Sequence, residues 1–181
     1  MVSMKCSLEE RVHEFDTLFQ MSQVIQKLVG VWVGKGVGVY PPHVAEFHYV
    51  EELTIKQTAK PIVFEFRSTT KHAKSGEPMH VEVGFIRCPP RAPVEIVSSH
   101  PFGLTEISQG TLQSDFKLEL TSSEQNGTIT RVRSATDPHT TGIRRVYELS
   151  QDGNELLFTM DMATSLHPDM QNHLICKLKK Q

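Results

Sequence analysis

The chain has 181 residues, which suits a single domain with a sizeable hydrophobic core. Hydrophobic residues make up 38%, charged residues make up 22%, and the formal net charge is −2, so the composition is globular and argues against a nucleic-acid-binding surface. The sequence has no apolar run near the roughly 18 residues of a membrane span, and its N-terminus does not resemble a signal peptide. Three widely separated cysteines in such a chain predict free thiols and a cytoplasmic location.

Residues 8–28 predict a helix, because apolar side chains recur at spacings of three and four and Ser7 with Glu10 has the spacing of a capping box. After Gly30 the period changes to two, and segments rich in glycine, proline and asparagine separate short apolar-polar alternations. About ten short strands without a second helical block predict an all-β fold, a closed antiparallel up-and-down barrel with the N-terminal helix plugging one end. Allowing two of them to merge, we expect strands near residues 32–39, 46–55, 61–69, 78–87, 94–99, 103–108, 110–121, 127–134, 142–149, 155–163 and 171–179.

Three glycines at alternate positions follow the lone tryptophan, Trp32, in the segment GVWVGKGVGVYPP. A phosphate-binding glycine loop needs a strand before it and a helix after it, and the predicted order here is the reverse. Gly34, Gly36 and Gly38 instead remove side chains from one face of a strand. Two interpretations stay open, namely strong curvature of the barrel and space for a flat ligand against the strand.

Nine histidines are many for this length, and His80, His167 and His173 lie in or beside predicted strands. No pair has the helical spacing of a zinc protease and no Cys-x-x-Cys motif occurs, so a zinc site is not visible in the sequence, although strands can assemble one from distant residues. A Gly-x-Ser-x-Gly motif is also missing, which leaves a serine hydrolase without support. For any single histidine, a surface or hydrogen-bonded core position is the ordinary alternative.

Two adjacent arginines, Arg144 and Arg145, lie in the predicted strand GIRRVYEL. Alternation turns one of them outward and the other into the barrel. An inward arginine needs a hydrogen-bond acceptor or an aromatic face, because a buried unpaired charge is costly. We expect Trp32 to supply such a face.

A Gly-x-Trp motif at the start of an antiparallel barrel, with an arginine toward its far end, resembles the calycin superfamily of lipocalins and fatty-acid-binding proteins. Within that superfamily, the segments GVWVGKGVGVYP, FHYVEEL, PMHVEVGFIR, IRRVYEL, MAT and HLICKLKK resemble the nitrobindins, which are haem-binding β-barrels. The resemblance covers residues 24–180 in order. It divides the chain into an N-terminal helical extension, residues 1–23, and a haem-binding barrel domain, residues 24–181.

The resemblance implies ferric haem b at one end of the barrel, with a histidine of the last strand as the axial iron ligand. That histidine corresponds to His173, while Met79, His80 and Met162 correspond to pocket residues of the family. His80 is the competing candidate for the iron ligand. Pro42 stands where the family usually has a threonine close to the haem, so a hydroxyl contact and a backbone N–H are both lost there.

Strand alternation conflicts with the assignment of His173 as a ligand. Leu174 and Cys176 alternate with lysines and should face the interior, which turns His173 outward. Either a β-bulge turns His173 back toward the interior, as the resemblance favours, or the interior face is assigned wrongly at this end.

Two classes of function remain open. The resemblance implies a haem protein that binds nitric oxide and isomerises peroxynitrite to nitrate, with small molecules as its partners and a homodimer as a form of assembly. The alternative is a barrel that carries a lipid or another apolar molecule without haem. A Soret band in the purified or haem-reconstituted protein distinguishes the two.

Overall fold

The computed structural model describes residues 24–42, 44–89, 92–114, 117–135 and 137–181. A short helical stretch at residues 24–27 precedes the first strand. The rest of the predicted helix over residues 8–28, and the extension over residues 1–23, lie outside the described residues. Eleven strands form in the described part of the chain: β1 (Gly30–Tyr40), β2 (Val44–Gln57), β3 (Val63–His72), β4 (Pro78–Arg87), β5 (Val94–His100), β6 (Leu104–Ser114), β7 (Lys117–Ser123), β8 (Ile129–Arg131), β9 (Thr140–Leu149), β10 (Glu155–Thr164) and β11 (Gln171–Lys180).

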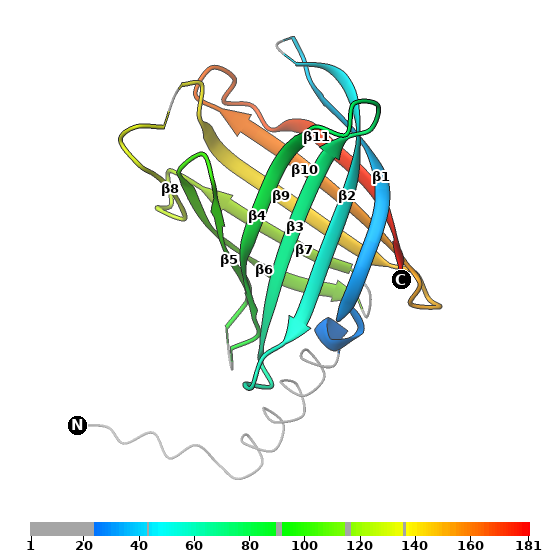
Figure 1. Ribbon diagram of the computed structural model, residues 1–181. Helices are drawn as coiled ribbons and strands as arrows, with labels where there is room; N and C mark the ends of the chain where they lie inside the picture. The colour runs from blue at the N-terminus through cyan, green and yellow to red at the C-terminus, as the bar shows by residue number, and fades with distance from the viewer. Residues whose placement is uncertain (1–23, 43, 90–91, 115–116, 136) are drawn as a thin grey trace, which may run out of the picture.

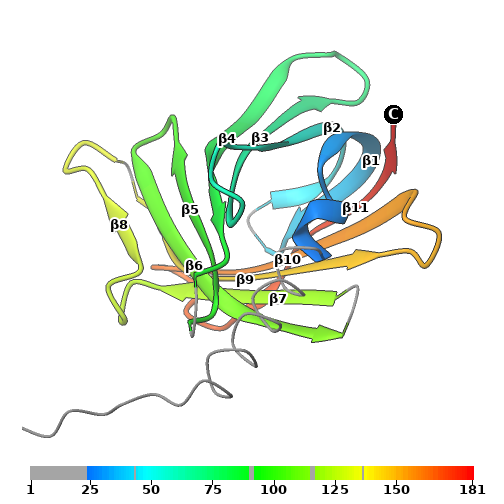
Figure 2. The same ribbon diagram turned by 90° about the horizontal axis from the view of Figure 1, so that it is seen from below.

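Ten of these described strands close into one antiparallel barrel, which Figures 1 and 2 show from the side and from below. Neighbours in the chain pair with one another from β1 to β7, β7 pairs with β9, and β1 closes the ring by pairing with β11. The short strand β8 lies outside the ring and pairs with the first residues of β6. The predicted closed antiparallel barrel of about ten strands is therefore confirmed. Among the described residues, none of the helical structure is long and apolar enough to cross a membrane.

The boundary between the sixth and seventh strands was predicted in the wrong place. The expected break after residue 108 does not exist, because β6 continues through Gly110 to Ser114. A Cβ at Gly110 would overlap the backbone carbonyl of Glu119 on β7. This glycine therefore allows two strands to approach closely rather than ending one of them.

The barrel interior changes from apolar at one end to polar toward the other. Along β5, for example, the inward positions begin with Val94 and Ile96 and end with Ser98 and His100. The helical stretch of residues 24–27 lies at the apolar end of the barrel (Figure 1). Its Ile25 packs into the core, so the prediction that the helix plugs one end is confirmed for this part of the helix. Further buried members of that core include Leu28, Leu53, Ile55, Phe64, Phe66, Leu118, Leu120 and Leu156.

The alternating glycines of β1 make room for other parts of the protein. A Cβ at Gly36 would overlap the ring of Tyr49, and a Cβ at Gly38 would overlap the ring of Phe47. The interpretation that these glycines leave space for a flat ligand is therefore wrong, because aromatic side chains of β2 fill that space. Both rings in turn form part of the wall of a cavity inside the barrel.

Trp32 is completely buried, and its indole N–H donates a hydrogen bond to the Leu28 carbonyl at 2.8 Å. The ammonium group of Lys180 lies 5.2 Å from the centre of the indole ring, which is within cation–π distance. The tryptophan thus joins the helical stretch to the start of β1 and the end of β11. Its expected pairing with Arg145 is wrong, since Arg145 binds carboxylates instead, as described below.

Candidate functional site

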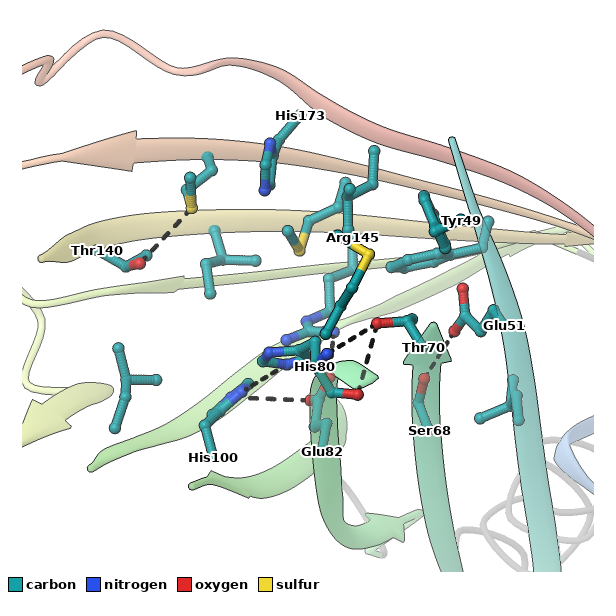
Figure 3. Close-up of a pocket in the computed structure, with 18 of the residues that line it drawn as sticks. Tyr49, Glu51, Ser68, Thr70, His80, Glu82, His100, Thr140, Arg145 and His173 are labelled. Carbon is teal, nitrogen blue, oxygen red and sulfur yellow. Dashed lines mark hydrogen bonds and ion pairs between the residues drawn. The ribbon is translucent and has the colours of Figure 1, made fainter. Parts of the chain in front are cut away.

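The polar part of the interior contains a cavity of about 320 Å³ (Figure 3). This volume lies in the range of small-molecule sites, and the wall combines aromatic and aliphatic side chains with a few polar groups. Four of the predicted site residues meet there, although they come from three different strands: Met79, His80, Met162 and His173.

His173 reaches the cavity because β11 contains a β-bulge at this position. Met160 of β10 pairs with Leu174 and the next residue, Asp161, pairs with Asn172, so His173 has no partner on β10. An extra residue of this kind changes the direction of the side chains on either side of it. Both His173 and Leu174 consequently line the cavity. The bulge that was one of the two alternatives from the sequence is confirmed.

The His173 ring is held in one orientation. Its Nδ1 lies 3.0 Å from the Val39 carbonyl oxygen, which can only accept a hydrogen bond, so Nδ1 carries the proton. The rings of Tyr40 and Phe47 pack edge-on against it, with centroid distances of 5.6 and 6.3 Å. Burial lowers the pKa of His173, although the bond to Val39 acts in the opposite direction. A neutral imidazole with its Nε2 lone pair free points into the cavity, as Figure 3 shows for the ring.

A second irregularity places Met79 and His80 in the same cavity. Thr69 of β3 pairs with Val81 and Lys71 pairs with Pro78, so Met79 and His80 together oppose the single residue Thr70. The Thr70 hydroxyl accepts a hydrogen bond from the backbone N–H of His80 at 2.9 Å. Two consecutive residues of β4 therefore contribute to the wall, as two consecutive residues of β11 do.

The His80 ring is engaged with a second histidine, His100, at the end of β5. Nε2 of His80 lies 3.1 Å from Nδ1 of His100, and the ring of Phe102 packs against both imidazoles. Burial, together with the neighbouring His100, lowers the pKa of His80 to about 4, so His80 is neutral at pH 7. Because its Nε2 already has a hydrogen-bond partner, His80 is less suited than His173 to bind an iron ion in the cavity.

Arg145 enters the cavity from β9 and is buried between two carboxylates. Its Nη1 donates to Glu82 Oε2 at 3.0 Å, and its Nη2 donates to Glu106 Oε2 at 2.6 Å. Burial alone would raise the pKa of Glu106, but the Arg145 guanidinium outweighs it and holds that pKa well below its usual value. The hydroxyl groups of Ser108 and Ser122 also donate to Glu106. The inward arginine thus has acceptors rather than an aromatic face, which was the other alternative from the sequence.

A third buried carboxyl group, that of Glu51, lies on β2, two strands away from Glu82 (Figure 3). The Ser68 hydroxyl donates a hydrogen bond to its Oε1 at 2.8 Å. Burial raises the pKa of Glu51, and Arg145 is only a minor opposing influence. Burial therefore moves the pKa of Glu51 upward, whereas the Arg145 guanidinium moves that of Glu106 downward.

The remaining candidates lie at the margin of the cavity or outside it. Met162 lines the wall, and its sulfur accepts a hydrogen bond from the Thr140 hydroxyl at 3.5 Å. Pro42 is exposed after β1, and His167 packs edge-on against Tyr40 with a centroid distance of 6.3 Å. Neither Pro42 nor His167 is among the described residues that line the cavity.

Sequence reasoning missed His100, Glu82 and Glu106. A signal was present, because His80 and Glu82 are two residues apart in a strand and must share a face, as must Glu106 and Ser108. Polar residues repeating at every second position on an inward face indicate a lined cavity rather than a hydrophobic core.

The geometry defines a class of protein: a closed barrel whose cavity contains a neutral imidazole with one free nitrogen among soft, mostly apolar side chains. The His173 nitrogen, together with the methionine and other apolar side chains that line the cavity, is a donor set that suits haem iron. The chain belongs to the family described as the THAP4-like, heme-binding beta-barrel domain, whose model matches residues 21–180. This membership confirms the resemblance to the nitrobindins.

Curated relatives agree with that membership. The chain is 34% identical over 163 residues to peroxynitrite isomerase 1 of Mycobacterium tuberculosis H37Rv, which covers 88% of this chain and 94% of the relative. It is 32% identical over 155 residues to peroxynitrite isomerase 1 of Mycolicibacterium paratuberculosis, and the match covers 85% of this chain and 91% of the relative. The crystal structure of Rv2717c from M. tuberculosis superimposes with a TM-score of 0.75 at 32% identity, covering 88% of this chain and 96% of that one.

Proposed function

We propose that this barrel binds ferric haem b through Nε2 of His173 and isomerises peroxynitrite to nitrate. The observation that carries the proposal is the β-bulge of β11, which turns His173 into the cavity, together with the hydrogen bond that leaves Nε2 free. The names of the curated relatives support the choice of reaction.

Each part of the wall has a separate task in this proposal. The Val39 carbonyl holds the His173 tautomer and so makes Nε2 the donor atom. The side chains of Met79, Met162 and Leu174 supply an apolar surface that excludes water from the space above the ligand nitrogen. His80, neutral and hydrogen-bonded through Nε2 to His100, lines the same cavity and, with its proton on Nδ1, can donate one hydrogen bond to a bound anion.

Haem iron, when bound, would supply a Lewis-acidic centre with one coordination position open to a small anion or diatomic molecule. Isomerisation of peroxynitrite to nitrate changes no atom count and needs no outside electron. The protein therefore has only to enclose the reacting molecule, keep water away and hold the imidazole in place.

The test compares two histidine variants of the full chain after reconstitution with haem. His173→Ala should abolish or greatly weaken haem retention, whereas His80→Ala should keep the haem and change mainly the ligands of the open iron position. Haem retention is read from the Soret band after gel filtration. Peroxynitrite decay is followed by stopped flow, with nitrate yield as the product measurement.

The exposed His48, whose side chain is 59% exposed, offers a matched control, since His48→Ala should change neither retention nor rate. A wild-type Soret band in His173→Ala together with its loss in His80→Ala would reverse the two roles. A wild type that takes up no haem would favour the carrier of an apolar molecule. An unchanged decay rate in the haem-loaded wild type would remove the isomerase activity from the proposal.

Three narrower proposals accompany this one: nitric oxide as a further ligand, assembly as a homodimer, and a cytoplasmic location. An apolar row on the outside of the barrel supports the homodimer. Phe85 pairs with Val97 and Val97 pairs with Ile107 across β4, β5 and β6; Phe85 and Ile107 are exposed and Val97 is partly exposed. The buried free thiols of Cys88 and Cys176 agree with a reducing compartment. Light scattering of the purified chain checks the assembly.

A further inference from the structure

Three metal-binding side chains converge on the cavity wall away from His173. One donor atom each from His80, Glu82 and His100 lies within 4.8 Å of the other two. Glu82 and His100 are deeply buried, with side chains 6% and 4% exposed. Figure 3 shows this group on β4 and β5, with His173 on the far side of the cavity.

Two polar side-chain atoms of this cluster have no hydrogen-bond partner within the described part of the chain, namely Glu82 Oε1 and His100 Nε2. They are 4.0 Å apart, and His100 Nε2 lies 3.8 Å from Glu106 Oε2, which is also too long for a hydrogen bond. Buried polar atoms are nearly always satisfied, because an unsatisfied one loses its hydration without gaining a partner. A pair of unsatisfied atoms facing each other across such a gap indicates a missing partner between them.

The charge balance indicates that the partner is a cation. One guanidinium, Arg145, lies between two buried carboxylates, Glu82 and Glu106, which leaves one negative charge in excess. Arg145 binds Oε2 of Glu82, so Oε1 stays available to a second positive group. An uncompensated charge in a buried position is costly, and a cation beside Glu82 would remove that cost.

The donors match a common type of metal site. Two imidazoles and one carboxylate are the protein ligands of several catalytic zinc sites and of non-haem iron(II) sites, both of which keep open positions for water or substrate. Binding would replace the hydrogen bond between His80 and His100 and draw the three side chains together, because zinc bonds to nitrogen are only about 2.0–2.1 Å long.

We propose that His80, Glu82 and His100 form a binding site for one divalent first-row transition-metal ion, with an open coordination position facing the cavity. The site is separate from His173 and does not rest on haem binding. An anion in the cavity would then meet a cation on this wall.

Zinc titration of the full chain tests the site. The purified protein, with whatever haem it retains, is treated with a chelator and titrated with ZnCl₂ by calorimetry at pH 7.5. We expect one zinc ion per chain, and a weakening of at least about tenfold in His100→Gln and Glu82→Gln, since even changes to outer partners of metal ligands cost 10–100-fold. Zinc should also raise the unfolding temperature of the wild type but not of these variants.

Two further variants separate the possible outcomes. His80→Gln removes a ligand that is only partly buried and leaves the Arg145 ion pairs in place, so the result does not depend on folding of the two buried variants. His139→Gln is the matched control, because His139 also lies near two carboxylates, those of Asp137 and Glu124, but outside the cavity.

The proposal is overturned by any of three results. The wild type binds no zinc stoichiometrically, in which case the cluster holds no metal ion. Alternatively, the cavity variants bind zinc as the wild type does, or the affinity is lost in His139→Gln, which identifies a surface site only. His173→Ala should still bind zinc at this site, so failure of the haem proposal leaves this result intact.

Discussion

Glu51, which lines the cavity, and Glu106, which binds the cavity residue Arg145, are both buried glutamates, and their pKa values move in opposite directions. Burial raises both, but Glu106 also faces the Arg145 guanidinium, whereas Glu51 has the Ser68 hydroxyl as its hydrogen-bond donor. A hydroxyl can bond to either form of a carboxyl group, while a guanidinium strongly favours the carboxylate. The difference shows that the hydrogen-bonding partner, rather than the depth of burial, decides in which direction the pKa of each glutamate moves.

The largest expected effect follows from removal of the shared cation. Arg145→Met leaves Glu82 and Glu106 buried without their guanidinium, and breaking a buried ion pair from one side costs about 3–5 kcal/mol. We expect a loss of this size in the free energy of unfolding at pH 7, measured by urea denaturation. The loss should shrink at acidic pH, because the two carboxyl groups can then be protonated. A loss below about 1 kcal/mol would show that burial of the Glu82 and Glu106 carboxylates does not depend on the Arg145 guanidinium.

A smaller effect of opposite sign is expected when Glu51 is replaced. Glu51 has a folded-state pKa above its usual value, so its contribution to stability is complete below about pH 4.3 and is lost as the pH rises through the folded pKa. Glu51→Gln stays neutral at every pH and should stabilise the protein at pH 8 by on the order of 1 kcal/mol, because a carboxylate buried without a cation is costly. The gain should vanish near pH 4.

Thermal unfolding of both proteins across pH 4–8 measures this difference. Glu106 has the reverse sign, because its folded pKa is lowered: its contribution is present above about pH 4.3 and is lost as the pH falls. The wild type should therefore lose stability at acidic pH as Glu106 becomes protonated. Glu51→Gln should lose the same amount there, because it still contains Glu106. A stability difference between the wild type and Glu51→Gln that does not change with pH would contradict the raised pKa of Glu51.

The smallest effect is expected at the neighbouring arginine on the outside of the same strand. Arg144 donates to Glu119 at 2.7 Å and to Asp161 at 3.0 Å, but its side chain is 39% exposed. Ion pairs in contact with solvent contribute about 0.2–1 kcal/mol. Arg144→Met should therefore change the free energy of unfolding by no more than this, and equal losses at Arg144 and Arg145 would remove the distinction between the two faces of β9.

The barrel could be predicted from the sequence because alternation is a local property. Phe64 and Phe66 are buried while Glu65 and Arg67, which alternate with them, are exposed, and the same pattern repeats from strand to strand. The one misplaced strand boundary, at Gly110, arose because a glycine signals a turn and a close strand approach equally well.

The candidate site was harder to predict because it depends on departures from alternation and on strand register. His173 faces the cavity only because β11 contains an extra residue, and no period in the sequence reveals that residue. The partners of Arg145 lie 63 and 39 residues away along the chain, on strands that the register brings beside it. Alternation indicated that one arginine points inward, but the identity of its acceptors required the pairing of the whole barrel.

The bond between His173 and Val39 has a consequence for the cooperativity of the whole barrel. It joins β11 to β1, so the side chain proposed to hold a ligand also belongs to the contact between the last and first described strands, where the ring closes. A ligand that binds only the closed form adds its binding free energy to closure, by RT ln(1 + [L]/Kd). Occupancy of the cavity and protection of the backbone amides along β1 and β11 from hydrogen exchange should therefore rise and fall together, which makes these two strands a single cooperative unit.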